Sequence, residues 1–371
     1  MSPNNFHSQS EKYDYILHQH GGYYRYNFID HAYLYNLYFP PEEIFTNFKE
    51  QVHSLVLNYP VAQSELAELV GTIIDQPAER IVVGNGAAEL IKIVSGKIAG
   101  KLIIPVPSFN EYANAAPSGQ VVEFPLDFPS FQLDVDKFAE EAIRVKADFA
   151  VVVSPNNPTS ILVPKSEIIR LVKKLEKHNC ILIVDESFLD FSENPEQVSL
   201  EKDIAKYPNL AIFKSMSKAY GICGLRLGYL LTANSVFAEA VRAGVHIWNI
   251  NGFAEEFLRQ LPNYKNEFIE SCAKVRIDRD RLYEKLAGLA GMTVYKPDAN
   301  YIYCRVPDDG ESAPEIARKL FIKHNILIKD CAGKTQREGD RYLRIASRSE
   351  IENSSLVEAL IDVMATKAEE K

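Results

Sequence analysis

The strongest constraint on the fold is the alternation, through the middle of the chain, of short apolar runs with amphipathic helical patterns. Between several of the runs lie patterns such as 165–177, where the apolar residues share one helical face. The runs are apolar throughout, as strands of a sheet covered on both faces must be. This alternation predicts an α/β fold with a mostly parallel sheet. The expected strands are 81–83, 102–104, 121–124, 149–153, 181–184, 210–213 and 227–231.

The two ends of the chain carry different patterns. Residues 1–40 are aromatic-rich and irregular, and their many tyrosines are expected to pack on the protein rather than stay in water. A chain of 371 residues suggests two or three packing units. We therefore predict a large domain over 41–262 and a smaller α+β domain over 263–371, with the N-terminal arm 1–40 as part of the smaller one. In the smaller domain, helices are expected over 263–288, 313–324 and from 350, and strands over 293–295, 301–306, 326–329 and 342–345.

Charge, hydropathy and cysteine usage narrow the class of protein. Asp and Glu number 50 against 41 Lys and Arg, a formal net charge of −9, which argues against a general binder of nucleic acid or anionic membranes. The sequence has no apolar run of about 18 residues and no apolar core of a secretory signal near residue 10. The five cysteines have no CxxC spacing, which indicates reduced thiols and neither a disulfide framework nor a metal site. These features predict a cytoplasmic enzyme.

The run 215–228 (SMSKAYGICGLRLG) combines groups that could hold a phosphate monoester beside a reactive amine. The hydroxyls of Ser215 and Ser217 and the guanidinium of Arg226 suit phosphate oxygens. Lys218, if desolvated beside a cation, would have a depressed pKa and become nucleophilic. A lysine that merely opens a solvated helix is the alternative. The glycines beside Arg226, which let backbone approach closely, favour the functional interpretation.

This run resembles the lysine signature of the class I/II aminotransferases, and it matches every fixed position of that pattern. The members are enzymes of fold type I that use pyridoxal phosphate (PLP). The resemblance implies a large domain with a mostly parallel seven-stranded sheet, a smaller α+β domain, and a PLP cofactor attached to Lys218. It also implies a small amino acid or phosphoamino acid as substrate.

Further segments extend the resemblance around the cofactor. Asp185, at the end of an expected strand, would pair with the pyridine nitrogen and keep it protonated. Asn157, in the segment SPNNPT, would hydrogen-bond the phenolic oxygen of the ring. In the segment VGNGAAE, the backbone N–H groups of Ala87 and Ala88 would meet the cofactor phosphate at a helix start.

Two aromatic positions complete the cofactor set. In the segment PSFNEY, Phe109 is the expected ring-stacking residue, and Tyr112 is the alternative. Tyr59, in the segment NYP, matches a tyrosine that reaches the cofactor phosphate of the neighbouring subunit. The resemblance therefore implies a homodimer.

The substrate-binding residues follow from the same resemblance. Arg344 matches the arginine that holds the substrate carboxylate, a task for which the planar guanidinium fork is suited and lysine is not. His20 and Gly21 resemble the His-Gly-Gly segment with which threonine-phosphate decarboxylases bind the substrate phosphate. Lys329 stands where the histidinol-phosphate aminotransferases have a second arginine. The full set of expected substrate contacts is His20, Gly21, Asn36, Asn157, Lys329 and Arg344.

The sequence leaves the reaction open between two branches. The histidinol-phosphate aminotransferases share the segment SKAYG around Lys218, and the completeness of the lysine signature places amino transfer first. The threonine- and serine-phosphate decarboxylases share the features near His20 and the segment 185–191 (DESFLDF), in which Phe188 replaces a common tyrosine. Both reactions begin with the substrate amine joined to the cofactor at Lys218, and the orientation of the α-carbon decides which bond breaks. A third possibility is a PLP-sensing regulator without catalysis. It is disfavoured because such proteins carry a basic upstream region, whereas this chain is acidic.

Overall fold

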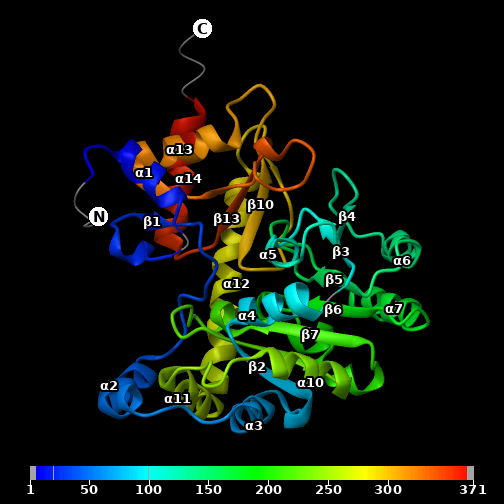
Figure 1. Cartoon of the computed structure of the whole chain (residues 1–371). Coiled ribbons are helices and arrows are strands. Elements are labelled where there is room, and N and C mark those ends of the chain that lie inside the picture. The colour runs from blue at the N-terminus through cyan, green and yellow to red at the C-terminus, as the bar shows by residue number, and fades with distance from the viewer. Residues whose placement is uncertain (1–5, 20, 99, 366–371) are drawn as a thin grey trace. The chain divides into compact units, whose positions relative to one another are not determined.

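The computed structural model describes residues 6–19, 21–98 and 100–365, which belong to two compact units (Figure 1). The large unit comprises residues 35–157 and 161–274, and the small unit comprises residues 1–34, 158–160 and 275–371. The predicted domain bounds, with a large domain over 41–262 and a smaller domain over 263–371 that includes the arm 1–40, stay a prediction. Among the described residues, no helix is long and apolar enough to cross a membrane.

The large unit is built on a seven-stranded sheet with the strand order β2-β8-β7-β6-β5-β3-β4. Strand β8 is antiparallel to both of its neighbours, and the other neighbouring pairs are parallel. The strands are β2 (Ile81–Asn85), β3 (Leu102–Val106), β4 (Val121–Pro125), β5 (Phe149–Val153), β6 (Ile181–Asp185), β7 (Leu210–Ser215) and β8 (Leu227–Thr232). Each coincides with one of the predicted apolar runs, so the mostly parallel seven-stranded sheet is confirmed.

Helices of the large unit cover the sheet, as the burial of its central strands on both faces requires. Side chains such as Leu90 of α4, Phe237 of α10 and Ile183 of β6 share one apolar core. The helices are α2 (Glu42–Leu57), α3 (Gln63–Ile74), α4 (Ala87–Ile93), α5 (Glu111–Ala115), α6 (Val135–Arg144), α7 (Lys165–Glu176), α8 (Pro195–Val198), α9 (Met216–Ala219), α10 (Ser235–Gly244) and α11 (Gly252–Gln260). Helix α12 (Lys265–Ala287) begins in the large unit and ends in the small one.

The small unit combines a four-stranded antiparallel sheet, in the order β12-β13-β10-β9, with helices. Its strands are β9 (Thr293–Val294), β10 (Tyr301–Arg305), β12 (Lys329–Asp330) and β13 (Tyr342–Ala346), and its helices include α13 (Ala313–His324) and α14 (Glu350–Ala365). A separate parallel pair joins β1 (Ile29–Asp30) to β11 (Ile326–Leu327). The expected strand 326–329 is therefore two short strands in different sheets.

The N-terminal arm differs from its prediction as irregular chain. Helix α1 (Gln9–Leu17) begins after Ser8, whose hydroxyl accepts a hydrogen bond from the backbone N of Glu11. Tyr13 and Ile16 of this helix are buried in a cluster with Phe321 of α13. The prediction that the aromatic rings pack on the protein is confirmed for this cluster, and the packed side stabilises a helix that the tyrosine-rich sequence obscured.

Candidate active site

The polar residues singled out in the large unit gather at one edge of its sheet. Because β2, β3, β5, β6 and β7 are parallel to one another, their carboxyl ends lie at the same edge, where α/β proteins place their sites. Asp185 ends β6, Ser215 ends β7, and Arg226 directly precedes antiparallel β8. The strand order thus brings together residues 41 positions apart in the sequence.

The Asp185 carboxylate is buried and firmly held at this edge. Its Oδ1 accepts a hydrogen bond from the backbone N of Ser187 at 3.0 Å, and its Oδ2 accepts one from the hydroxyl of Tyr112 at 2.9 Å. Burial raises the pKa of Asp185, and hydrogen bonds from Ser187 and Tyr112, with the positive charge of Lys218, act in the opposite direction. The carboxylate is therefore placed to stabilise a cation such as a protonated pyridine.

Lys218 lies on α9, in the turn that directly follows β7. Asn36 braces this turn: its backbone N donates to the Lys218 carbonyl at 2.9 Å, and its Nδ2 donates to the Ala219 carbonyl at 2.9 Å and to Ser271 Oγ at 2.8 Å. Its Oδ1 accepts from the backbone N of Tyr38 at 2.9 Å. The Asn36 amide thus has structural partners, and its expected contact with the substrate stays a prediction.

Two glycines allow the start of α4 to approach β8. Gly86 has φ 71°, and a Cβ at this position would lie 2.3 Å from Nη2 of Arg226. At Gly228 a Cβ would lie 2.5 Å from the backbone N of Ala87. Nη1 of Arg226 in turn donates to Ser217 Oγ at 3.3 Å. A guanidinium, a hydroxyl and the chain turn at the start of α4 are therefore brought together without room for larger side chains.

The remaining cofactor positions differ in burial. Asn157 is buried, and Ala88 is exposed. Phe109 is partly buried against the apolar core, and its ring lies 6.4 Å from that of Tyr112 at an angle of 80°. The hydroxyl of Tyr112 is bound to Asp185, whereas Phe109 has no hydroxyl to make such a bond. Phe109 therefore stays the expected stacking residue of the pair.

Tyr59 is exposed on the large unit and stacks on an aromatic residue that the sequence analysis had not singled out. The rings of Tyr59 and Trp248 lie 4.2 Å apart at 23°, and 76% and 50% of the two residues are exposed. The next residue, Asn249, is tied to the core: its Nδ2 donates to Glu89 Oε2 at 2.7 Å, and its carbonyl accepts from Asn85 Nδ2 at 2.7 Å. Hydrogen bonds therefore connect the Trp248 segment to the end of β2 and to α4.

The expected substrate cations lie in the small unit. Lys329 and Arg344 are paired residues on the neighbouring antiparallel strands β12 and β13, so their side chains leave the sheet on the same face. Arg344 Nη2 donates to the Ala32 carbonyl at 2.6 Å, and burial lowers the pKa of Arg344. Lys329 is about half exposed, with its Nζ 3.5 Å from Oδ2 of Asp330. Gly21 is exposed, and His20 lies outside the described residues.

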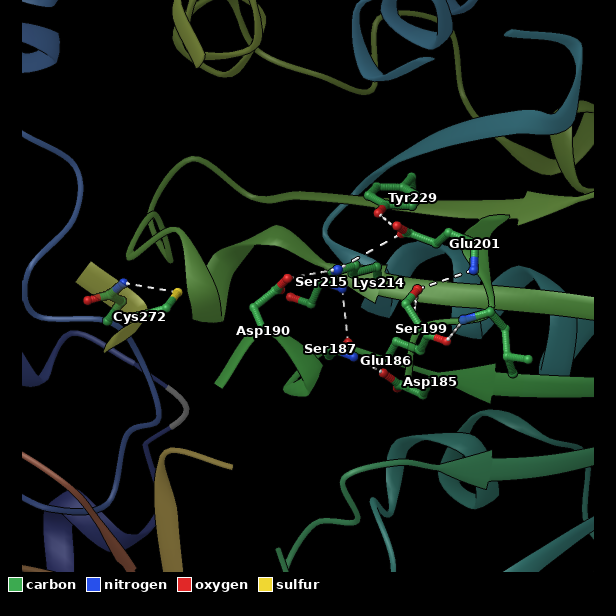
Figure 2. A network of polar contacts seen from close by, with 12 residues as sticks. Asp185, Glu186, Ser187, Asp190, Ser199, Glu201, Lys214, Ser215, Tyr229 and Cys272 are labelled. Atoms are coloured by element: carbon green, nitrogen blue, oxygen red, sulfur yellow. Dashed lines mark hydrogen bonds and ion pairs between the residues drawn. The ribbon is translucent and has the colours of Figure 1, made fainter. Parts of the chain in front are cut away.

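A buried ionic network lies beside the candidate site and was missed from the sequence (Figure 2). Lys214 Nζ lies 3.0 Å from Asp190 Oδ1 and 3.9 Å from Glu201 Oε1. Glu186 accepts from Ser199 Oγ at 2.7 Å and from a backbone N at 2.9 Å. Burial, and then the charge of Glu201, raise the pKa of Glu186 to about 7. The signal available in the sequence was the position of Lys214, which directly follows the expected strand 210–213 and lies four residues before Lys218.

The residues at the sheet edge fit pyridoxal phosphate. That cofactor requires a lysine, a carboxylate for its pyridine nitrogen and donors for its phosphate. The edge supplies Lys218, the buried Asp185 carboxylate, and the hydroxyl and guanidinium of Ser217 and Arg226. The fold and this donor set together define a PLP enzyme of fold type I.

Comparison with known proteins identifies the family. The sequence pattern of the family described as Aminotransferase class I and II matches residues 47–360, so the chain belongs to this family. It is a PLP-dependent enzyme, and the resemblance seen in the lysine signature is confirmed.

Similar proteins include both branches of the resemblance. CMP-5'-(3-aminopropyl)phosphonate synthase of Streptomyces rubellomurinus is 43% identical over 345 residues, which cover 93% of this chain and 54% of that protein. L-serine phosphate decarboxylase of Sulfurospirillum multivorans is 30% identical, over 88% of this chain and 84% of that protein. The crystal structure of histidinol-phosphate aminotransferase from Clostridium acetobutylicum has a TM-score of 0.83 at 28% identity and covers 91% of this chain and 99% of that one. The chain thus spans about half the length of its Streptomyces relative.

Proposed function

We propose that the chain removes the α-carboxylate of a small amino acid whose side chain ends in a phosphate or phosphonate. The observation that carries the substrate class is the pairing of Lys329 with Arg344 on adjacent strands. Such a substrate presents two anionic groups, and two neighbouring cations match them. In this proposal Arg344 holds the carboxylate, and Lys329 reads the phosphate with help from Gly21 and His20.

The cofactor-binding roles are part of the same proposal. When bound, pyridoxal phosphate supplies an electron-withdrawing ring that accepts the charge left on the α-carbon. Asp185 holds a proton on the pyridine nitrogen, and the Lys218 amine carries a proton to the α-carbon. Ser215, Ser217, Arg226, Ala87 and Ala88 bind the phosphate, Asn157 binds the phenolic oxygen, and Phe109 stacks on the ring.

Decarboxylation is supported by the relatives. The product named for the Streptomyces protein is a phosphonate that ends in an amine, and the Sulfurospirillum protein is named a decarboxylase. Amino transfer, which the lysine signature placed first, is the second candidate, and its support is the likeness to the histidinol-phosphate aminotransferase structure.

Product analysis separates the two reactions. The chain is incubated with phosphoserine, phosphothreonine or 2-amino-4-phosphonobutyrate, which is 3-aminopropylphosphonate with the lost carboxylate restored. We expect carbon dioxide and the amine without 2-oxoglutarate. An oxo acid that forms only with 2-oxoglutarate would establish amino transfer instead. Turnover of unphosphorylated amino acids alone would refute the substrate class.

We also propose a cytoplasmic homodimer in which Tyr59 reaches the phosphate of the neighbouring subunit. Support comes from exposed apolar side chains on α2 and next to it, together with the segment of Trp248. These residues are Val52, Val56, Leu57, Tyr59, Ile247 and Trp248. Water contact with so many large apolar groups is unfavourable, and a second copy would remove it. Sedimentation that shows a fully active monomer at the assay concentration would contradict the dimer.

The proposed cytoplasmic location is supported by the cysteines. All five are free thiols, as expected in a reducing compartment.

A further inference from the structure

Ser187 joins the two strand ends that carry the candidate catalytic residues. It lies two residues beyond Asp185 and is 5% exposed. Its backbone N donates to Asp185 Oδ1 at 3.0 Å, and its hydroxyl oxygen accepts from the backbone N of Ser215 at 2.9 Å (Figure 2). The Ser187 side chain also lowers the pKa of the Asp185 carboxyl.

The bond to Ser215 extends the sheet past the last regular pair of β6 and β7. The parallel ladder ends with Asp185 opposite Phe213, where the backbone N of Glu186 donates to the Phe213 carbonyl at 2.9 Å. One step further, regular pairing would offer the Ser215 N–H a backbone carbonyl of the neighbouring strand. The Ser187 hydroxyl takes that place. A side chain therefore fixes Ser215, the residue directly before α9, and α9 carries Lys218.

A serine hydroxyl has one hydrogen to donate and accepts through its lone pairs. Here the oxygen accepts from the Ser215 N–H, and the backbone N–H of the same residue donates to Asp185. Ser187 is thus the residue through which the start of α9 and the Asp185 carboxylate are linked.

We propose that Ser187 is a positioning residue of the active site, whose backbone N–H and hydroxyl together set the Asp185 carboxylate relative to the start of the helix that carries Lys218. The proposal deepens the proposed function and rests on the roles of Asp185 and Lys218. Around the carboxylate, Tyr112 comes from α5, Lys218 from α9, and Ser187 from the segment after β6. The charged groups of Glu186 and Lys214 lie in the neighbouring network. Of these groups, Ser187 is the one that contacts both strand ends, Asp185 through its backbone N and Ser215 through its hydroxyl.

Loss of the hydroxyl should change the pKa of Asp185 in a defined direction. Because the Ser187 side chain favours the ionised carboxylate, Ser187→Ala should raise the pKa of Asp185. A less anionic Asp185 holds the pyridine proton less well. The lysine–cofactor linkage then loses a nearby positive charge, and its own pKa should rise.

The test compares Ser187→Ala with Ser187→Thr, which keeps a hydroxyl, and with Ser199→Ala, which removes the hydroxyl bound to Glu186. In the loaded enzyme, the pH midpoint of the visible absorption band and kcat and KM are measured. We expect Ser187→Ala to raise the midpoint and to lower kcat up to about tenfold at nearly constant KM. Ser187→Thr should restore both quantities, and Ser199→Ala should change neither.

A second readout separates this proposal from the proposed function. The carboxyl carbon of Asp185 is titrated by 13C NMR in the full chain before cofactor is added. A higher Asp185 pKa in Ser187→Ala supports the positioning role even if the wild type fails to label at Lys218, a failure that would refute the function alone. If Ser187→Ala keeps the wild-type NMR titration, band midpoint and kcat and loses only thermal stability, Ser187 is a structural cap and the proposal is overturned.

Discussion

The Asp185 carboxylate in the large unit and the Lys329 ammonium in the small unit are held in opposite ways. Asp185 is 3% exposed, and each of its oxygens accepts a hydrogen bond of 3.0 Å or less from another residue. The Lys329 side chain is 48% exposed, and it forms an ion pair with the adjacent residue Asp330 at 3.5 Å. One charge is fixed by α5 and the end of β6, whereas the other is fixed by little beyond its own strand.

Under the proposed function, this difference separates two tasks of the enzyme. The charge assigned to the cofactor is preorganised, because moving it would break two buried hydrogen bonds at once. The charge assigned to the substrate can be exchanged at small cost, because a half-exposed ion pair contributes little to stability. A family with a fixed cofactor and varied substrates is expected from this arrangement.

The largest effect is expected in the large unit, when the reactive amine of Lys218 is removed. Lys218→Ala should lower turnover on the order of a thousandfold or more, because the proton carrier is lost. Borohydride reduction and peptide mapping of the wild type should place the cofactor on Lys218. Lys214 is the buried neighbour that tests the assignment. A label there would contradict it, and Lys202→Ala, an exposed lysine, should behave as wild type.

A smaller but still large effect is expected at the carboxylate. Asp185→Ala should retain cofactor and lose turnover by about a hundredfold or more, because the pyridine nitrogen is no longer held protonated. Cofactor absorbance and kcat, measured on the same sample, separate binding from catalysis. Turnover near the wild-type value in a cofactor-loaded sample would remove this role from Asp185.

Substitution of Lys329 in the small unit should change KM for one class of substrate only. Lys329→Ala should raise KM about tenfold for a phosphorylated substrate, the lower range for a charge-assisted contact that is half exposed, and leave the unphosphorylated analogue nearly unchanged. Lys323→Ala, on the exposed side of α13, is the matched control. Equal changes for both substrates would take the phosphate away from Lys329.

The smallest effect concerns the pH dependence of stability, which the buried network of Glu186 and Lys214 should influence. The pKa of Glu186 is raised from 4.5 to about 7, so between these values the folded state binds more protons than the unfolded state. The free energy of unfolding should therefore decrease as pH rises from about 4.5 to about 7. Glu186→Gln stays neutral, and it can accept from the backbone N with its oxygen and donate to Ser199 Oγ with its nitrogen. This variant should flatten the slope in urea titrations. An unchanged slope would show that another group dominates.

The two regions also differ in what the sequence could predict. The seven apolar runs of the large sheet were found because strands covered on both faces need no alternation. The expected helix 313–324 has the bounds of α13, which Ser312 caps and after which Asn325 ends the helix. The polar roles were harder. Phe109 and Tyr112 are three residues apart, yet the contact of Tyr112 with Asp185 depends on β3, β5 and β6 lying side by side. The link through Ser187 requires the register of β6 and β7, which no local pattern reports.

Trp248 is the sole tryptophan of the sequence, and its ring is stacked on Tyr59 and half exposed. The intrinsic fluorescence of the protein at wavelengths that excite only indole therefore originates from one known position. Transfer of that ring from water to an apolar contact shifts its emission to shorter wavelength. Association of two copies through this face can thus be followed optically by dilution, with no label attached to the protein.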